Sequence, residues 1–138
     1  MSESVRELEG KVALGTGATR GIGRGIADEL ARAGARVAVV GRGEESAAKV
    51  AAGLPGDGHR GYGCDVADGE AVDALIASVE KDMGGLDVLV NNAGVTADNL
   101  LMRMKDDEWE RVLAVNLRGA FHTIRAASKG MMRRRAGR

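Results

Sequence analysis

The stretch that decides the fold is "LGTGATRGIGRGIA", Leu14 to Ala27, which holds five glycines in fourteen residues. Glycine makes up 21 of the 138 residues, about twice its usual share, so glycine spacing alone carries little weight. The position of the glycines is more informative, because an apolar run (11–15) leads into them and an apolar helical pattern (22–33) begins among them. At such a turn free backbone N–H groups and the positive helix end bind dinucleotide phosphates, and glycine lets them approach. The stretch predicts a phosphate-binding loop; the alternative is a flexible turn.

The remaining chain alternates between strand and helix patterns. Further short apolar runs predict strands at 36–40, 59–66 and 86–90. Helical patterns follow at 44–54, from the capping residue Asp68 to Met83, and after Asp106 through most of the remainder. The third helix carries a regular apolar stripe: Val72, Leu75, Ile76, Val79 and Met83. This alternation is typical of right-handed βαβ units on a parallel sheet.

Composition excludes several classes of protein. A hydrophobic content of 44% with 29% charged residues is typical of a globular rather than a disordered chain. Twenty basic and twenty acidic residues cancel, which argues against nucleic acid or membrane partners. Cys64 is the sole cysteine, so no internal disulfide and no cysteine-based metal site is expected. With a polar start and no apolar run near 18 residues, the sequence predicts a cytoplasmic protein.

Three motifs stand at the ends of predicted strands or directly after them. They are "TGATRGIG" (Thr16 to Gly23), "CDV" (Cys64 to Val66) and "NNAG" (Asn91 to Gly94). Together they resemble the short-chain dehydrogenase/reductases, and the resemblance runs from Leu8 to the last residue. The stretch "NNAGVTADNLLMRMKDDEWERVLAVNL" is similar, more narrowly, to bacterial 3-oxoacyl-[acyl-carrier-protein] reductases.

The resemblance implies a nicotinamide cofactor and residues that bind it. Asp65 would bond the adenine amine with Val66 packed beside it, and three residues of the last motif would lie along the ribose. The implied cofactor-binding residues are Thr16, Gly17, Ala18, Thr19, Arg20, Gly21, Ile22, Gly23, Arg42, Asp65, Val66, Asn92, Ala93 and Gly94.

The end of the second predicted strand indicates which cofactor is preferred. NAD-preferring members of the family carry an acid there, whereas this chain has Gly41-Arg42-Gly43. Arg42 and Arg20 can approach a 2′-phosphate, and a charge-assisted bond of about 1.5–3 kcal/mol would favour NADP(H) over NAD(H) roughly ten- to a hundredfold. The alternative is that both arginines are solvated surface residues.

Two further positions match the family. Asn116 lies between Leu113 and Leu117 on an apolar stripe, which predicts a buried amide that needs partners. The matching asparagine of the family distorts its helix and holds a water that passes protons to the catalytic lysine; a satisfied core amide is the alternative. Arg135 matches the basic position at the active-site rim that grips the acidic acyl carrier protein. The terminal "RRRAGR" also fits a helix end or, less well, a nucleic-acid tail.

The family's catalytic serine, tyrosine and lysine have no match in this sequence. Tyr62 is the only tyrosine and lacks a lysine four residues later. His59 and His122 have no acidic partner at useful spacing and are expected on the surface. Residues 1–138 are therefore expected to be the N-terminal portion of a Rossmann-type NAD(P)-binding domain, inactive alone.

The resemblance also implies an architecture and an assembly. We expect a three-layer α/β/α fold with four parallel strands in the order 3-2-1-4, ending after the fourth strand and its helix. That strand would be an open edge, and the uncovered long helix would pack against its mate in a homo-oligomer, a tetramer in the intact family.

Two functions remain open on the sequence. The first is NADP-dependent reduction of a 3-oxoacyl thioester, on acyl carrier protein or coenzyme A, in fatty-acid synthesis. The second is a dinucleotide-binding fragment or pseudoenzyme without catalysis. A short-chain reductase for another carbonyl substrate is a variant of the first.

Overall fold

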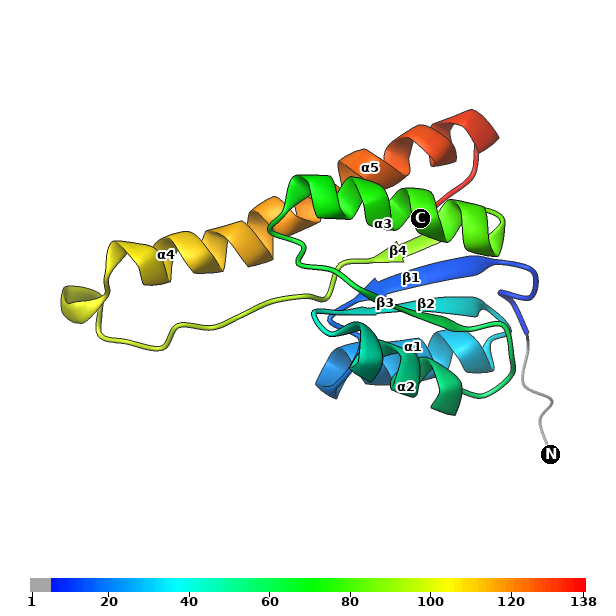
Figure 1. Cartoon of the computed structure of the whole chain (residues 1–138), viewed down its shortest axis with the longest axis horizontal. Coiled ribbons are helices and arrows are strands. Elements are labelled where there is room, and N and C mark those ends of the chain that lie inside the picture. Colours follow the sequence, from blue (N-terminus) through cyan, green and yellow to red (C-terminus); the bar gives the residue numbers. More distant parts are fainter. Residues whose placement is uncertain (1–5) are drawn as a thin grey trace.

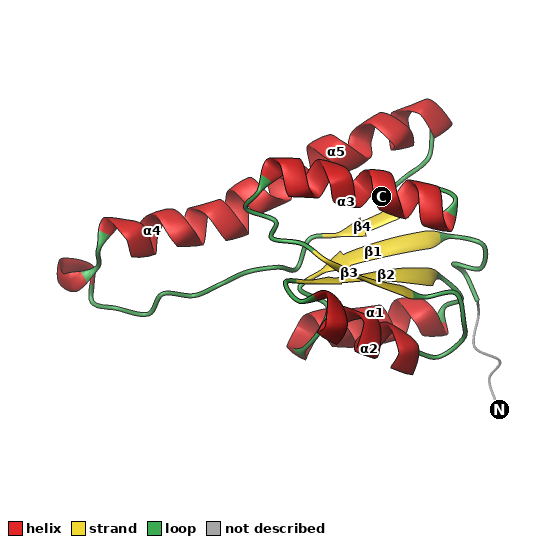
Figure 2. Cartoon of the chain, viewed as in Figure 1, coloured by secondary structure: helices red, strands yellow, loops and turns green. Residues whose placement is uncertain are grey.

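The chain folds around a four-stranded parallel sheet. The computed structural model describes residues 6–138. Its strands are β1 (Val12–Thr16), β2 (Arg36–Gly41), β3 (Arg60–Gly63) and β4 (Val88–Val90), in the order β3-β2-β1-β4 (Figure 2). Leu14 of β1 stands beside Ala38 of β2 and Leu89 of β4. The predicted strand order is confirmed.

Helices cover both faces of the sheet. α1 (Gly21–Arg32) and α2 (Glu44–Gly53) lie on one face, and α3 (Gly69–Met83) and α5 (Gly119–Arg134) on the other (Figure 1). The sheet has a hydrophobic core on each face, and alternate residues of β1 point into one or the other. Leu14 packs with α3, and Ala13 packs with α1 and α2. The three-layer α/β/α architecture is confirmed.

Small side chains build the core between the sheet and α1. The buried residues of this helix are Gly23, Ala27 and Ala31. The apolar stripe that the sequence shows on the same helix faces the sheet only in part: Ile22 is 77% exposed, whereas Leu30 is half-buried and packs against this core. Small residues let the helix lie close to the strands, and the larger ones pack at the margin of this core or lie exposed.

The core on the opposite face has larger side chains. All five apolar residues of the α3 stripe are buried. Asp68 caps the helix, because its carboxylate accepts hydrogen bonds from the N–H groups of Glu70 and Ala71. Gly84 ends the helix in the left-handed conformation with φ 87°. Both ends of α3 are thus specified by the local sequence.

After β4 the chain runs away from the sheet and returns as one long helix. It passes a short 3₁₀ turn, η1 (Leu101–Arg103), and then forms α4 (Asp106–Leu113), a π-helical turn, η2 (Ala114–Arg118), and α5. Figure 1 shows α4 projecting beyond the sheet, and no residue of α4 is buried. Within residues 6–138, no helix has both the length and the apolar character needed to cross a bilayer.

The outer edge of β4 is not fully open, which corrects the expectation of an open edge. The Arg138 N–H donates to the Asp87 carbonyl at 2.9 Å, and the Leu89 N–H donates to the Arg138 carbonyl at 2.8 Å. These two bonds bracket Val88 as one rung of a parallel ladder does. Arg138 therefore pairs with β4 on the side away from β1.

Candidate cofactor cleft

A cleft of about 600 Å³ lies where the carboxyl ends of the strands meet their loops. Eleven of the predicted site residues line it: Gly17, Thr19, Arg20, Gly21, Ile22, Arg42, Asp65, Val66, Asn92, Ala93 and Gly94. The sequence did not point to another eight: Val40, Gly41, Gly43, Ser46, Cys64, Val95, Arg111 and Val115. Most of these eight are chain neighbours of predicted residues, but Arg111 reaches the cleft from α4.

The three motif glycines are required for different reasons. Gly17 and Gly21 have φ of 60° and 58°, a conformation that other residues adopt at a cost. A Cβ on Gly17 would also lie 2.9 Å from the Cα of Ala93. Gly23 has ordinary backbone angles, but a Cβ there would overlap the carbonyl of Gly17 and the amide of Asn92. The loop therefore tolerates no side chain at Gly17 or Gly23.

Thr16 ties the first loop to the last. Its hydroxyl oxygen accepts hydrogen bonds from the N–H groups of Asn92 at 3.0 Å and Ala93 at 2.9 Å. The Asn92 side chain donates to the Gly17 carbonyl at 3.1 Å. Thr16 and Ala18 are buried, and neither they nor Gly23 line the cleft. These three residues shape the loop from below, and their predicted contact with a cofactor stays a prediction.

The electrostatics of the cleft favour an anion. Its lining includes three arginines, Arg20, Arg42 and Arg111, and a single carboxylate, Asp65. The N-terminus of α1 has no side-chain cap and no acidic residue in its first turn, so its N–H groups remain available to a ligand. An exposed helix end, glycines without room for a side chain and excess positive charge together fit a dinucleotide pyrophosphate.

Cys64 lies in the wall of the cleft beside Asp65. Burial raises the pKa of the Cys64 thiol to about 11, with smaller contributions from Asp65 and Asp68. The thiol is protonated near neutral pH and is a poor nucleophile there. Cys64 therefore contributes shape rather than chemistry to this wall.

Asn116 stands at the centre of the π-helical turn, but it is not buried as predicted. Its residue is exposed, and its amide is paired with the main chain of Val95. The Val95 N–H donates to Oδ1 at 2.8 Å, and Nδ2 donates to the Val95 carbonyl at 3.0 Å. Because both polar groups of the Asn116 amide are bonded to the loop after β4, the side chain is satisfied without being buried in the core. π-helical turns often occur at functional sites.

The two histidines are not surface residues as predicted. The imidazole of His122 is buried, with Nδ1 2.9 Å from the Val66 carbonyl. His59 is half-buried; its Nδ1 accepts from the Val37 N–H at 3.0 Å, and its Nε2 lies 2.7 Å from the Pro55 carbonyl. Both rings bond to the main chain, a partner that a search for acidic side chains cannot reveal.

Tyr62 is far from a catalytic environment. Its hydroxyl donates to Asp82 of α3 at 3.0 Å, and it does not line the cleft. Burial, followed by the bond to Asp82, raises the pKa of Tyr62 to about 12. A phenol that holds its proton so strongly is a poor general acid at neutral pH.

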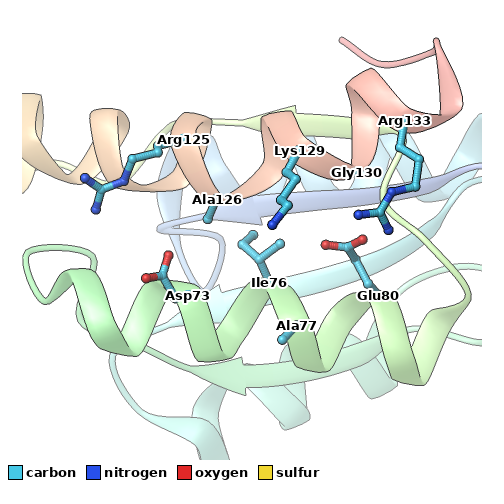
Figure 3. Close-up of a pocket in the computed structure, with 9 residues that line it drawn as sticks. All are labelled: Asp73, Ile76, Ala77, Glu80, Arg125, Ala126, Lys129, Gly130 and Arg133. Carbon is cyan, nitrogen blue, oxygen red and sulfur yellow. The ribbon is translucent and has the colours of Figure 1, made fainter.

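A second hollow, of about 360 Å³, separates α3 from α5 (Figure 3). Asp73 and Glu80 of α3 face Arg125, Lys129 and Arg133 of α5 across it. In Figure 3 the side chains of Glu80 and Arg133 point toward one another. Glu80 forms an ion pair with Arg134 of α5 at 3.8 Å, so the charges along this hollow link the two helices rather than form a ligand site.

Arg135 does not line the cleft. It follows α5 in the left-handed conformation, with φ 55°. The preceding Arg134 bonds to the carbonyl of Leu86, at the start of the segment that leads into β4. Arg135 therefore lies near the amino ends of the strands, whereas the cleft lies at their carboxyl ends. Among residues 6–138, no group of three or more His, Cys, Asp or Glu side chains could hold a metal.

The fold and the cleft define a class: a doubly wound α/β protein with a cleft at the carboxyl ends of its strands, the place where such proteins bind dinucleotides. The family model described as short chain dehydrogenase matches residues 11–138. The chain belongs to this family, which implies a nicotinamide dinucleotide cofactor.

Several proteins named 3-oxoacyl-[acyl-carrier-protein] reductase FabG are similar to this chain. The one from Haemophilus influenzae is 46% identical over 131 residues, covering 95% of this chain and 54% of the relative. The one from Escherichia coli K12 is 43% identical over 131 residues, covering 95% and 53%. The one from Staphylococcus aureus Mu50 is 48% identical over 130 residues, covering 92% and 53%. The chain thus spans about half the length of the curated relatives that it matches.

Proposed function

We propose that residues 1–138 bind NADP(H) as the cofactor-binding half of a reductase for 3-oxoacyl thioesters. The observation that carries this proposal is the glycine-rich turn between β1 and α1, locked to the loop after β4 and open to the cleft. The substrate class comes from the relatives, whose names specify a 3-oxoacyl-[acyl-carrier-protein].

Preference for NADP(H) rests on the charges around the end of β2. Arg42 follows β2, Arg20 precedes α1, and both line the cleft. The end of β2 offers no carboxylate to the ribose hydroxyls. A phosphate on the 2′ oxygen would meet two guanidinium groups, which bind phosphate in a bidentate geometry. We expect NADPH to bind roughly ten- to a hundredfold more tightly than NADH.

The chain's own residues bind and orient the cofactor. The N-terminus of α1 would hold the pyrophosphate, Asp65 the adenine amine with Val66 beside it, and Asn92 to Gly94 the ribose. The nicotinamide ring supplies hydride when the cofactor is bound. Asn116, at the π-helical turn, lies beside Gly94 and would orient a water near that ring. Its Oδ1 would lie 3.4 Å from a Cβ at Gly94.

Proton delivery to the substrate requires groups that these residues do not supply. The developing alkoxide needs a positioned acid, and Tyr62, the only tyrosine, holds its proton beside Asp82. We expect the family's serine, tyrosine and lysine in the half of the relatives that this chain does not match. The chain would then bind cofactor without turnover.

Two surfaces support proposals about partners. Arg135 is exposed together with Arg133 and Arg138 and lies away from the rim of this chain's cleft, where it was expected; these cations would still attract an acidic partner such as a carrier protein. Trp109, Leu117, Phe121 and Ile124 form an outer row on the long helix, and each is more than half exposed. An exposed apolar row of this kind favours association, so we propose that it pairs with the same helix of a second copy.

A fusion tests the proposal. Residues 1–138 are joined to the unmatched half of the Haemophilus influenzae relative, and NADPH oxidation is followed with acetoacetyl-acyl carrier protein. The fusion is expected to turn over at an ordinary rate, about 1–10³ s⁻¹, and the 138-residue chain to show no turnover above background. A fusion that binds NADPH yet reduces no acyl thioester would favour a non-catalytic dinucleotide-binding role or another carbonyl substrate. Turnover by the short chain would show that it contains an acid we have not assigned.

A further inference from the structure

The buried imidazole of His122 contacts the loop that carries Asp65 and Val66. Nδ1 lies 2.9 Å from the Val66 carbonyl. A carbonyl only accepts hydrogen bonds, so Nδ1 carries the proton and donates. Nε2 faces Gly69, the first residue of α3, where it would be 3.3 Å from a Cβ. The ring therefore fills the corner between α5, α3 and the loop after β3.

Val66 is held from a second side by the same helix. Gly119, one turn before His122, lies so close that a Cβ there would be 2.7 Å from Cγ2 of Val66. Val66 is buried and lines the cleft. Its side chain therefore rests on the α5 backbone while its carbonyl is bonded to an α5 side chain.

The loop itself is a tight turn with little freedom of its own. The Ala67 N–H donates to Oδ1 of Asp65 at 3.0 Å, and the Asp68 N–H donates to the Asp65 carbonyl at 3.0 Å. These bonds tie Asp65, and with it Val66, to Asp68 at the start of α3. A contact that fixes Val66 also fixes the Asp65 carboxylate in the wall of the cleft.

We propose that His122 is a positioning residue for the adenine end of the cleft. It contacts no ligand and acts by holding Val66 and Asp65. The proposal rests on the proposed function, since it takes the cleft to bind an adenine dinucleotide. Without the imidazole the Val66 carbonyl loses its buried donor and the loop can shift away from the adenine.

The test measures binding of adenosine 2′,5′-bisphosphate to the full chain by calorimetry. This probe carries the adenine and 2′-phosphate but no nicotinamide. His122→Leu should weaken its binding about tenfold. His122→Asn places an amide N–H near the position of Nδ1 and should restore binding to within threefold. His122→Gln places its amide near the position of Nε2 and should resemble the leucine variant.

His59→Leu is the matched control. It removes the other imidazole, which also bonds to the main chain but at the amino ends of β2 and β3, away from the cleft. It should lower stability and leave binding within twofold. This comparison separates positioning of the cleft from general loss of stability.

The outcomes are distinct. Unchanged binding by His122→Leu, equal binding by the asparagine and glutamine variants, or an equal loss in His59→Leu would each overturn the inference while the proposed function stands. If the leucine variant does not fold, the difference in binding between the asparagine and glutamine variants tests the inference instead. Failure of the unaltered chain to bind the probe would overturn both the inference and the proposed function.

Discussion

The inner and outer faces of the long helix differ sharply. On the inner face Gly119, His122 and Thr123 are buried, and each contacts a loop of the cleft or an element beside it. The Thr123 hydroxyl, for example, lies 2.5 Å from Oδ1 of Asn91. On the outer face Leu117 and Phe121 are 67% and 55% exposed. One helix thus has a packed face and an unpacked one.

This difference indicates which properties residues 1–138 can provide without a partner. The inner face completes a cleft whose loops are locked by hydrogen bonds within these 138 residues. On the outer face most of the apolar surface is exposed within residues 6–138, apart from the Phe121 ring, which Arg125 partly covers at 4.7 Å. Cofactor binding should therefore survive in isolation, while assembly and catalysis should depend on partners or on further sequence.

Gly23→Ala should have the largest effect. The added methyl overlaps the backbone of Gly17 and the amide of Asn92, so the lock between the two loops cannot form. We expect NADPH affinity to fall at least about a hundredfold, which corresponds to about 3 kcal/mol. Calorimetric titration measures the loss.

Gly25→Ala is the control in the same helix. A Cβ at Gly25 meets nothing within 4 Å, so this variant should bind NADPH normally. It should also gain about 0.5–1 kcal/mol of stability from higher helix propensity. Equal losses of affinity in both alanine variants would refute the explanation from loop packing.

Arg42→Asp should reverse or erase the cofactor preference. Removing one cation and adding an anion at the end of β2 should repel a 2′-phosphate and offer a carboxylate to the ribose. The ratio of NADPH to NADH affinity should fall about ten- to a hundredfold. Arg60→Asp makes the same charge change at the amino end of β3 and should keep the preference. If Arg42→Asp leaves the ratio of NADPH to NADH affinity unchanged, Arg42 is a solvated surface residue that does not contact the cofactor.

Phe121→Glu should separate copies of the chain. A charge in the centre of the outer row opposes burial of that row in an interface. We expect association to weaken about tenfold or more, measured by sedimentation equilibrium. Ala52→Glu adds the same charge on α2, across the sheet, and should change nothing. A strictly monomeric parent chain at tens of micromolar would count against the interface itself.

The smallest predicted effect concerns pH. Burial raises the pKa of Cys64 to about 11 in the folded chain, so the folded state keeps a proton that the unfolded state releases near pH 9. Its stabilising contribution is complete below pH 9 and is lost as the pH rises toward 11. Urea unfolding should show a loss of about 1 kcal/mol between pH 8 and 10 that is absent in Cys64→Ala. A parallel pH dependence in both chains would contradict this origin.

The sequence predicted the fold well where local signals agree with packing. The stripe on α3, its Asp68 cap and the alternation of strands and helices appear in the structure as predicted. Periodicity is less informative for α1, because there a glycine and two alanines face the sheet and the larger Ile22 does not. Close approach selects small side chains, and a hydrophobicity pattern does not distinguish such a face.

The site was predictable where the motif residues follow strands. The carboxyl ends of parallel strands meet at one edge, so residues as distant as Gly17 and Gly94 gather there. Asn116 and His122 could not be placed in this way. Their partners are main-chain groups of Val95 and Val66, whose position depends on the tertiary path of the loops.

Titration of the unaltered chain with NADPH and NADH, followed by calorimetry, tests the central claim most directly. The claim is that these 138 residues form a complete cofactor cleft. We predict saturable one-to-one binding of NADPH, with NADH at least about tenfold weaker. Heats of NADPH addition that do not differ from dilution, with the chain folded, would contradict it.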